Sequence, residues 1–188
     1  EVELRTMHPI RKAKIDEWFK RTAGVRLRGA NACLKFTEAR CYPELKGQTD
    51  VAILDVGAHF GQTSYGFRLG FPGATIHAFE PVDGSFSELE RVAGPHGIRA
   101  HQLALGDAPG EVEIFLRGQE GKSTENSLLN TSGGEHGDSS GRSQVVRVET
   151  VDGFCKREGI DRVDVLKIDA EGYDLQVLEG AEGMISSG

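Results

Sequence analysis

From Val51 onward, short apolar runs alternate with segments whose apolar residues recur at helical spacing. The runs at 51–56, 74–79, 98–103 and 163–168 have the length and composition of buried strands. Helical spacing follows in the segments 62–70, 85–92 and 173–185. This alternation predicts a doubly wound α/β fold, in which helices cover both faces of a mainly parallel sheet.

A second group of elements interrupts this pattern. The segments 111–116 and 145–149 have strand character and are expected to pair antiparallel, and 151–158 is expected to be helical. Between the two strands lies the polar stretch 117–144, whose length is typical of a lid, a binding loop or a spacer. Ser85 and Glu88 fit a capping box at the start of the second helix.

Two domain regions are expected. Residues 1–50 form a helical lead-in, in which Ile15, Trp18 and Phe19 make an apolar stripe that docks on the main domain or covers a substrate. Residues 51–188 form the main domain. An open sheet of this class normally continues beyond a fourth strand and its helix, so the sequence is expected to be truncated in its C-terminal part.

Charge and composition narrow the function. The 188 residues carry a net charge of −7, and residues 51–188 alone carry 11 Lys and Arg against 22 Asp and Glu. An acidic body disfavours nucleic acid as a partner. No apolar run reaches the roughly 20 residues of a membrane span, and no secretory leader is visible. The three cysteines form no C-x-x-C pair, so we expect a cytoplasmic protein with free thiols, with a Cys33–Cys41 bridge left open. The oligomeric state is not indicated.

The segment 54–61, Leu-Asp-Val-Gly-Ala-His-Phe-Gly, is the most informative part of the chain. It joins the first strand to the first helix, and Glu80 closes the second strand 19 residues beyond Gly61. This order of strand, glycine turn, helix, strand and acid is typical of a nucleotide-type cofactor site. Gly57 and Gly61 are expected to let backbone N–H groups approach the ligand, and Glu80 to accept hydrogen bonds from ribose hydroxyls.

The type of nucleotide follows from the spacing. Dinucleotide sites use G-x-G-x-x-G, which supports a pyrophosphate on a helix N-terminus. Here the pattern is D-x-G-x-x-x-G, and Asp55 disfavours a pyrophosphate. A carboxylate suits the ammonium and sulfonium of S-adenosylmethionine (SAM). A NAD-type oxidoreductase and a purely structural turn are the alternatives for this loop.

Four ordered blocks resemble the FkbM family of SAM-dependent methyltransferases. They are 55–64 (DVGAHFGQTS), 78–81 (AFEP), 104–107 (ALGD) and 166–172 (LKIDAEG). The resemblance implies a class I, Rossmann-like methyltransferase fold and SAM as cofactor. His59 departs from the family's usual Asn. The cofactor-binding residues implied are Asp55, Gly57, Ala58, His59, Gly61 and Ser64, then Glu80 and Pro81 at the ribose, and Ala104, Leu105 and Asp107 near the adenine.

Charged residues alternate at the end of the fourth strand. Lys167, Asp169 and Glu171 are therefore the catalytic candidates, with Asp169 as the first choice for a general base and Glu171 as the second. Alternatively, one acid caps the last helix and the other pairs with Lys167. The histidines have no ligand spacing, so no metal site is expected.

The predicted function is methyl transfer from SAM to a hydroxyl of a small molecule, natural product or sugar. A non-catalytic binding domain is the alternative outside the enzymes.

Overall fold

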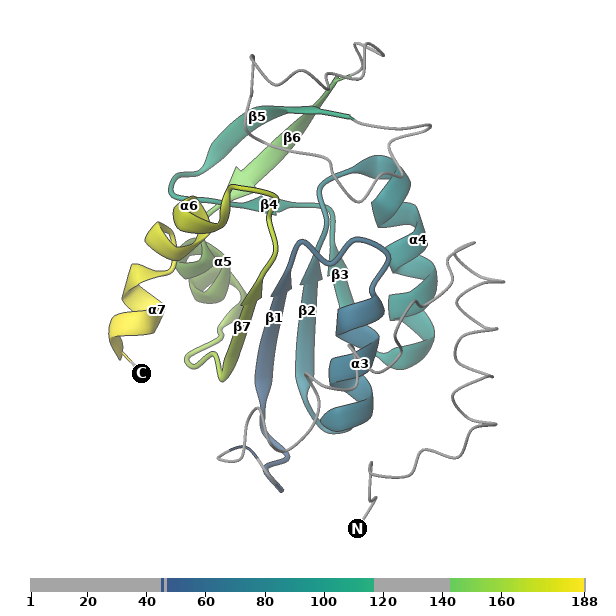
Figure 1. Ribbon diagram of the computed structural model, residues 1–188. Helices are drawn as coiled ribbons and strands as arrows, with labels where there is room; N and C mark the ends of the chain where they lie inside the picture. Colours follow the sequence, from purple (N-terminus) through teal and green to yellow (C-terminus); the bar gives the residue numbers. More distant parts are fainter. Residues whose placement is uncertain (1–44, 46, 117–142, 188) are drawn as a thin grey trace.

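The protein is described here from a computed structural model, which covers Leu45, residues 47–116 and residues 143–187. Four parallel strands form the main sheet in the order β3-β2-β1-β7 (Figure 1). They are β1 (Ala52–Val56), β2 (Thr75–Phe79), β3 (Arg99–His101) and β7 (Val165–Ile168). The parallel sheet confirms the doubly wound α/β class predicted from the alternation of apolar runs.

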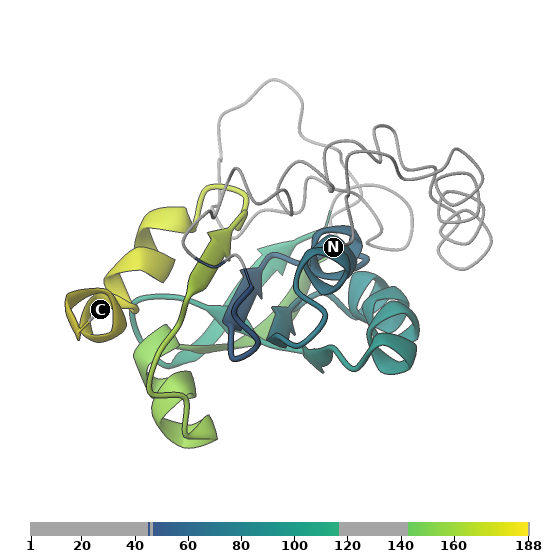
Figure 2. The same ribbon diagram turned by 90° about the horizontal axis from the view of Figure 1, so that it is seen from below.

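Helices cover both faces of this sheet (Figure 1, Figure 2). One face packs against α3 (Gln62–Gly70) and α4 (Asp83–Ala93), which continues into a short 3₁₀ turn, η3 (Gly94–His96). The opposite face packs against α5 (Val151–Glu158) and α6 (Asp174–Glu179), and α7 (Glu182–Ser187) follows α6. Both faces of the strands are therefore buried, as the continuous apolar runs in the sequence require.

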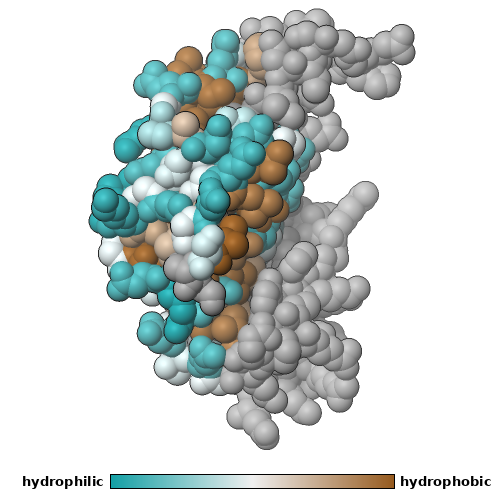
Figure 3. Space-filling view, turned by 90° about the vertical axis from the view of Figure 1, so that its left-hand side faces the viewer, coloured by the Kyte–Doolittle hydropathy of each residue, from teal (hydrophilic) through white to brown (hydrophobic). Residues whose placement is uncertain are grey.

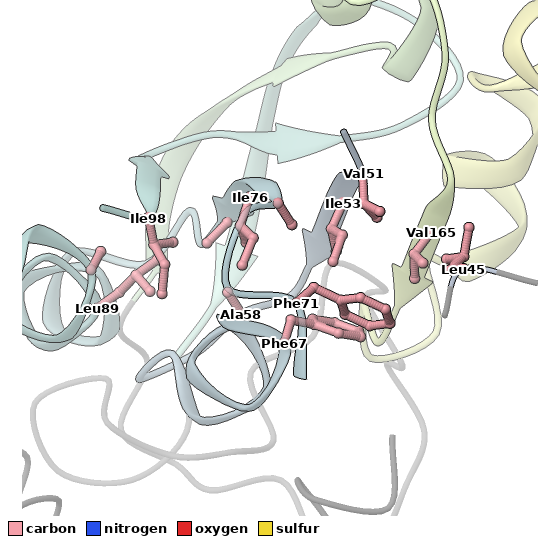
Figure 4. Packing of buried hydrophobic residues seen from close by; sticks show 13 residues of the cluster. Leu45, Val51, Ile53, Ala58, Phe67, Phe71, Ile76, Leu89, Ile98 and Val165 are labelled. Atoms are coloured by element: carbon pink, nitrogen blue, oxygen red, sulfur yellow. The ribbon is translucent and has the colours of Figure 1, made fainter. Parts of the chain in front are cut away.

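Neighbouring residues of β1 belong to two different cores. Ile53 packs with Phe67 of α3 and Leu89 of α4 in the first core, whose side chains Figure 4 shows between the sheet and these helices. Leu54 packs with Phe154 of α5 in the second core. Side chains alternate between the faces of a strand, so Asp55 lies on the same face as Ile53, toward α3.

A second, smaller sheet lies across the carboxyl ends of the main strands, at the top of Figure 1. Its order is β4-β6-β5, from β4 (Ala104–Leu105), β5 (Gly110–Phe115) and β6 (Ser143–Glu149). The antiparallel pairing of β5 and β6 confirms the sequence prediction, while β4, which runs parallel to β6, was not predicted. The small sheet therefore covers the carboxyl edge of the main sheet and contributes to the wall of the cavity there.

Two predicted features of the helices are wrong. The predicted single helix is two helices, because α6 ends at the C-cap Gly180 and α7 starts at Glu182. Only glycine fits at 180, since a β-carbon there would lie 1.9 Å from the carbonyl oxygen of Gly106. Asp152 then accepts hydrogen bonds from the N–H groups of Gly183 and Met184, which begin α7. The capping box is also wrong, because α4 already begins at Asp83 and Ser85 is a buried residue within it.

Other predictions concern residues outside those that the structure describes. Residues 1–44, which include the predicted apolar stripe of Ile15, Trp18 and Phe19 and the cysteines Cys33 and Cys41, lie outside the described residues, as do 117–142. Gln144, expected in the polar stretch, is part of β6. Within the described residues, Cys155 is a buried free thiol, and no helix is long and apolar enough to cross a bilayer.

The face that carries α6 and α7 is mostly hydrophilic and is interrupted by apolar patches (Figure 3). Leu175 and Leu178 of α6 and Ile185 of α7 are large apolar side chains with exposed fractions of 63%, 44% and 57%.

Two histidines are paired inside the second core. His77 Nδ1 lies 3.0 Å from His101 Nε2, and the edge of Phe154 packs against both rings. Burial, and next the positive charges of His101 and Arg99, lower the pKa of the buried His77 to about 4, against the charge of Glu158. His77 is therefore neutral in the fold at pH 7, and it donates to or accepts from His101 according to its tautomer.

This burial makes stability depend on pH. Because the folded pKa of His77 lies below the unfolded value of 6.5, the unfolded chain binds more protons between these values, and the stability contribution is lost as pH falls from 6.5 toward 4. Because of His77, the free energy of unfolding is expected to be about 2 kcal/mol lower at pH 5 than at pH 8. Urea unfolding of the wild type and of His77→Phe at both pH values isolates the contribution of His77 to the pH dependence of stability. Equal pH dependence of the two proteins would contradict it.

Candidate functional site

A cavity of about 310 Å³ opens at the carboxyl ends of the main strands. It lies where the strand order of the parallel sheet reverses, because β2 and β3 follow β1 on one side and β7 lies on the other. Ligands of open α/β sheets bind at such switch points, and the volume is within the range of small-molecule sites. Its wall combines the β1–α3 loop, the ends of β2 and β7, and Ile114 from the small sheet.

The β1–α3 loop uses its backbone donors inside the protein. The N–H groups of Gly57 and Ala58 both donate to the carbonyl of Phe79, at 3.1 and 2.9 Å, and that of Gly61 donates to the carbonyl of Ala58 at 2.8 Å. The N–H of His59 donates to Glu80 Oε2 at 2.9 Å. Three of these donors hold the loop against the end of β2 and the fourth, of Gly61, closes a turn within the loop, so these four do not form a cradle for a phosphate.

The two glycines of the loop are required for packing. Gly57 has φ +72°, and a β-carbon there would lie 2.0 Å from the carbonyl oxygen of Asp169 at the end of β7. Gly61 has φ +83°, and its β-carbon would meet Leu89 and Val92 of α4 at 2.9 and 3.2 Å. The close approach that these glycines permit is to β7 and α4, whereas the sequence predicted an approach to the ligand.

Gly57→Ala is therefore expected to lower the unfolding free energy by about 3 kcal/mol or more, from left-handed strain and the collision with Asp169. Gly97→Ala is the matched control, because Gly97 has φ +62° and nothing within 4 Å of the added carbon. It is expected to cost only about 1 kcal/mol. Urea unfolding measures both, and equal losses would show that the contact with β7 is unimportant.

Glu80 is held in a fixed orientation at the end of β2. Oε1 accepts from the N–H of Val82 at 3.0 Å, and Oε2 accepts from the N–H of His59. The residue is 6% exposed and lines the cavity. Burial raises its pKa to about 7, although these two hydrogen bonds and the Lys167 charge oppose the rise. Each carboxylate oxygen keeps a second lone pair, so ionised Glu80 can accept two further hydrogen bonds from a ligand.

Asp55 lies beneath the cavity and does not line it. It is fully buried, accepts a 2.5 Å hydrogen bond from the Ser64 hydroxyl, and lies 3.0 Å from Lys167 Nζ. Lys167 also donates to the carbonyls of Val56 and Gly57, at 3.2 and 2.9 Å. The sequence predicted a direct contact between Asp55 and a ligand cation, but in the structure the cation beside Asp55 is Lys167.

Asp169 and Glu171 lie on the β7 side of the cavity. The Asp169 side chain is 69% exposed and its carboxylate is 3.9 Å from Lys167 Nζ. Glu171 has φ +49°. The turn between β7 and α6 is held by Asp174, which accepts from the N–H groups of Ala170 and Gly172 at 3.1 and 3.3 Å. Asp174, and not Asp169 or Glu171, makes these bonds in the turn, and Asp169 lies in the cavity lining.

His59 contributes an imidazole to the cavity wall. Its ring packs on Phe60 with 3.6 Å between centroids, and Nε2 is buried with no hydrogen-bond partner among the described residues. Burial, and next the Lys167 charge, lower its pKa to about 4, against the Asp169 carboxylate. The neutral ring thus has a polar atom available to a ligand.

Most, but not all, of the predicted site residues come together. Those that line the cavity are Gly57, Ala58, His59, Glu80, Pro81, Ala104, Leu105, Lys167, Asp169 and Glu171. Asp55, Gly61 and Ser64 lie outside the lining, and Asp107 lines a separate hollow beside α6 and α7. The lining residues that were not predicted are Val56, Gln62, Thr63, Phe79, Val82, Leu103, Ile114 and Ala170. Within the described residues, no group of His, Cys, Asp or Glu is arranged to hold a metal ion.

Comparison with known proteins identifies related chains. The chain is 29% identical over 157 residues to "Methyltransferase 1" of Beauveria bassiana, covering 76% of this chain and 63% of that protein. It is 27% identical to "Methyltransferase sdnD" of Sordaria araneosa, covering 78% of this chain and 66% of the relative. It is also 27% identical to "31-O-demethyl-FK506 methyltransferase FkbM" of Streptomyces tacrolimicus, covering 69% and 59%. This chain thus spans about two thirds of the length of these relatives.

A solved structure has the same fold. The crystal structure of methyltransferase FkbM from Methylobacillus flagellatus matches with a TM-score of 0.50 and 17% identity, over 95% of this chain and 47% of that one. The family model described as "Methyltransferase FkbM domain" matches residues 55–187, which include the glycine loop, Glu80 and the β7 acids. The chain therefore belongs to the FkbM methyltransferase domain family.

Proposed function

We propose that this domain binds SAM and transfers its methyl group to a hydroxyl oxygen of a small molecule, natural product or sugar. The fixed carboxylate of Glu80 in the cavity is the observation that carries the proposal, because it suits two ribose hydroxyls. Membership of the FkbM family supports methyl transfer. The relative named as a 31-O-demethyl-FK506 methyltransferase supports oxygen as the acceptor atom.

The use of the loop donors distinguishes SAM from a dinucleotide. Glu80 alone fits the ribose of either cofactor. However, the N–H groups of Gly57, Ala58, His59 and Gly61 already have acceptors within the protein. A pyrophosphate binds to free N–H groups, so these four donors are not available to it, which supports a ligand without phosphate. The unpartnered Nε2 of His59 is a further polar atom for the amino-acid part of SAM.

The proposed residue roles follow the cavity wall. Glu80, with Pro81, holds the ribose, and Ala104 and Leu105 lie on the adenine side, near the apolar side chains of Leu103 and Ile114. Gly57, Ala58 and His59 adjoin the methionine part. When bound, SAM supplies a methyl group activated by a sulfonium. The protein aligns the acceptor and excludes water.

Asp169 is the proposed general base. Its exposed carboxylate at the cavity lets it accept the proton that an acceptor hydroxyl loses as the oxygen is methylated. Glu171, on the same side, is proposed to orient the acceptor. We also propose residues 51–188 as the methyltransferase domain and 1–50 as its lead-in, with 117–144 contributing to acceptor choice.

Turnover tests this function against a non-catalytic binding domain. The full chain is incubated with SAM and hydroxylated acceptors, and formation of S-adenosylhomocysteine (SAH) is followed with and without each acceptor. Acceptor-dependent SAH formation with a methyl ether as product is expected. SAH binding without turnover on any acceptor would favour the non-catalytic domain, and methylation of nitrogen or carbon would overturn the choice of oxygen.

A further inference from the structure

A buried ionic centre lies directly beneath the proposed SAM site. Asp55 of β1 and Lys167 of β7 are register partners on neighbouring parallel strands, and their charged groups are 3.0 Å apart. Ser64 of α3 donates to the other oxygen of Asp55. One buried carboxylate therefore connects three elements that meet at the cavity.

Lys167 is committed to this centre. A lysine ammonium has three donors and no acceptor. Here it lies within 3.2 Å of three oxygens, one from Asp55 and the carbonyls of Val56 and Gly57. Its side chain is 15% exposed, and the fourth oxygen, from Asp169, is 3.9 Å away. The ammonium nitrogen has no lone pair with which to accept a proton, and three protein oxygens surround it, so the geometry argues against Lys167 as a catalytic base.

The two carbonyls connect Lys167 to Glu80. The peptide units of the loop turn their carbonyls at 56 and 57 to Lys167, while the N–H groups of Gly57 and Ala58 are fixed on Phe79. The next N–H, that of His59, donates to Glu80 Oε2. The loop is thus held by Lys167 through its carbonyls and by Phe79 through its N–H groups. The N–H of His59 then orients the Glu80 carboxylate.

We propose that Lys167 is a positioning residue, whose ammonium fixes the Val56 and Gly57 carbonyls and thereby holds the His59 N–H that orients Glu80 toward the ribose hydroxyls. The inference rests on the proposed SAM function. The competing explanation is that Lys167 only neutralises Asp55, since a buried carboxylate without a counter-ion is strongly destabilising.

The test compares two ligands, SAH and its 2′-deoxy analogue, by calorimetric titration at pH 8.5. With Glu80 in position, the wild type is expected to bind SAH at least about tenfold more tightly than the 2′-deoxy analogue. This is the effect of the one hydrogen bond to the charged carboxylate that the analogue lacks. A general structural defect weakens both ligands equally and leaves their ratio unchanged. The ratio of the two dissociation constants is therefore the readout.

Three variants separate positioning from neutralisation. Lys167→Met leaves the buried Asp55 carboxylate without a counter-ion and destabilises the chain, so the double variant Asp55→Asn with Lys167→Met removes both charges. We expect the double variant to recover stability but to lose at least about fivefold of the preference for SAH. Asp55→Asn alone keeps the Lys167 contacts with the carbonyls and is expected to keep the preference. Lys156→Met, at an exposed position of α5, is the control for the substitution itself.

Each outcome decides the proposal. A double variant with the full preference for SAH would show that Lys167 is only a counter-ion. If Asp55→Asn loses as much of the preference for SAH as the double variant does, the ion pair, and not the contacts of Lys167 with the carbonyls, positions Glu80. If the folded wild type binds neither ligand, the proposed SAM function fails and this inference fails with it. Binding of both ligands with equal affinity leaves SAM binding intact and overturns only the positioning of Glu80.

Discussion

Glu80→Gln is expected to weaken SAH binding by about 100-fold. Hydrogen bonds to a charged group contribute about 1.5–3 kcal/mol each, and the ionised carboxylate can accept two from a ribose. The amide also sets an N–H₂ group against one of the two backbone N–H groups, of Val82 or His59, that orient the side chain. Calorimetric titration measures the change in the dissociation constant.

Glu88→Gln is the matched control for this substitution. Glu88 is a similarly buried glutamate, 8% exposed, on α4, and it pairs with Arg91 outside the cavity lining. It is expected to change SAH affinity by less than about threefold, in line with a site away from the ligand. Equal weakening by the two substitutions would contradict a direct role of Glu80.

The same carboxylate predicts how SAH affinity depends on pH. Below its raised pKa of about 7, Glu80 is protonated in the free protein. A ligand that needs the ionised form must then displace this proton. The affinity of the wild type is expected to fall by up to about tenfold per pH unit below 7. Glu80→Gln is expected to lack this dependence, and an identical pH profile for both proteins would exclude Glu80 as its source.

Asp169→Asn is expected to lower turnover by about 10²–10⁴-fold, which is the usual contribution of general acid–base catalysis. The side chain is 69% exposed, and the pairing with Lys167 is 3.9 Å long, so the stability change is expected to be small. SAH affinity should change by less than about threefold, which separates catalysis from binding.

Glu171→Gln serves as the comparison for Asp169→Asn. Both carboxylates line the cavity on the β7 side. If Asp169 is the base, its substitution reduces turnover far more than that of Glu171, and the loss at Asp169 diminishes when the acceptor hydroxyl is more acidic. A larger loss at Glu171 would exchange the two roles.

The sequence was sufficient for the features that depend on local pattern. Apolar runs around Leu54 and Ile76 predicted the parallel strands, and Glu80 at a strand end predicted a carboxylate at the cavity. Both predictions use rules that act within a few residues, because burial on two faces demands continuous apolar runs and parallel strands end at one edge of the sheet.

Features that depend on contacts between distant segments were not predictable in this way. Asp55 has the local pattern of a ligand contact, but its register with Lys167, 112 residues later, makes it an internal ion pair. The apolar alternation of Val112 and Ile114 predicts a buried face for β5, yet nothing in that pattern says that this face covers the cavity. Gly180 likewise must be glycine because the backbone of Gly106, 74 residues earlier, lies against it.

The central claim is that the cavity between β1 and β7 binds an S-adenosyl nucleoside. The most direct test is calorimetric titration of the wild-type chain with SAH, and with NAD⁺ as the comparison ligand. Saturable one-to-one binding of SAH without binding of NAD⁺ is the expected result. Binding of NAD⁺ in preference to SAH, or no heat from SAH with a chain that unfolds cooperatively, would contradict the claim.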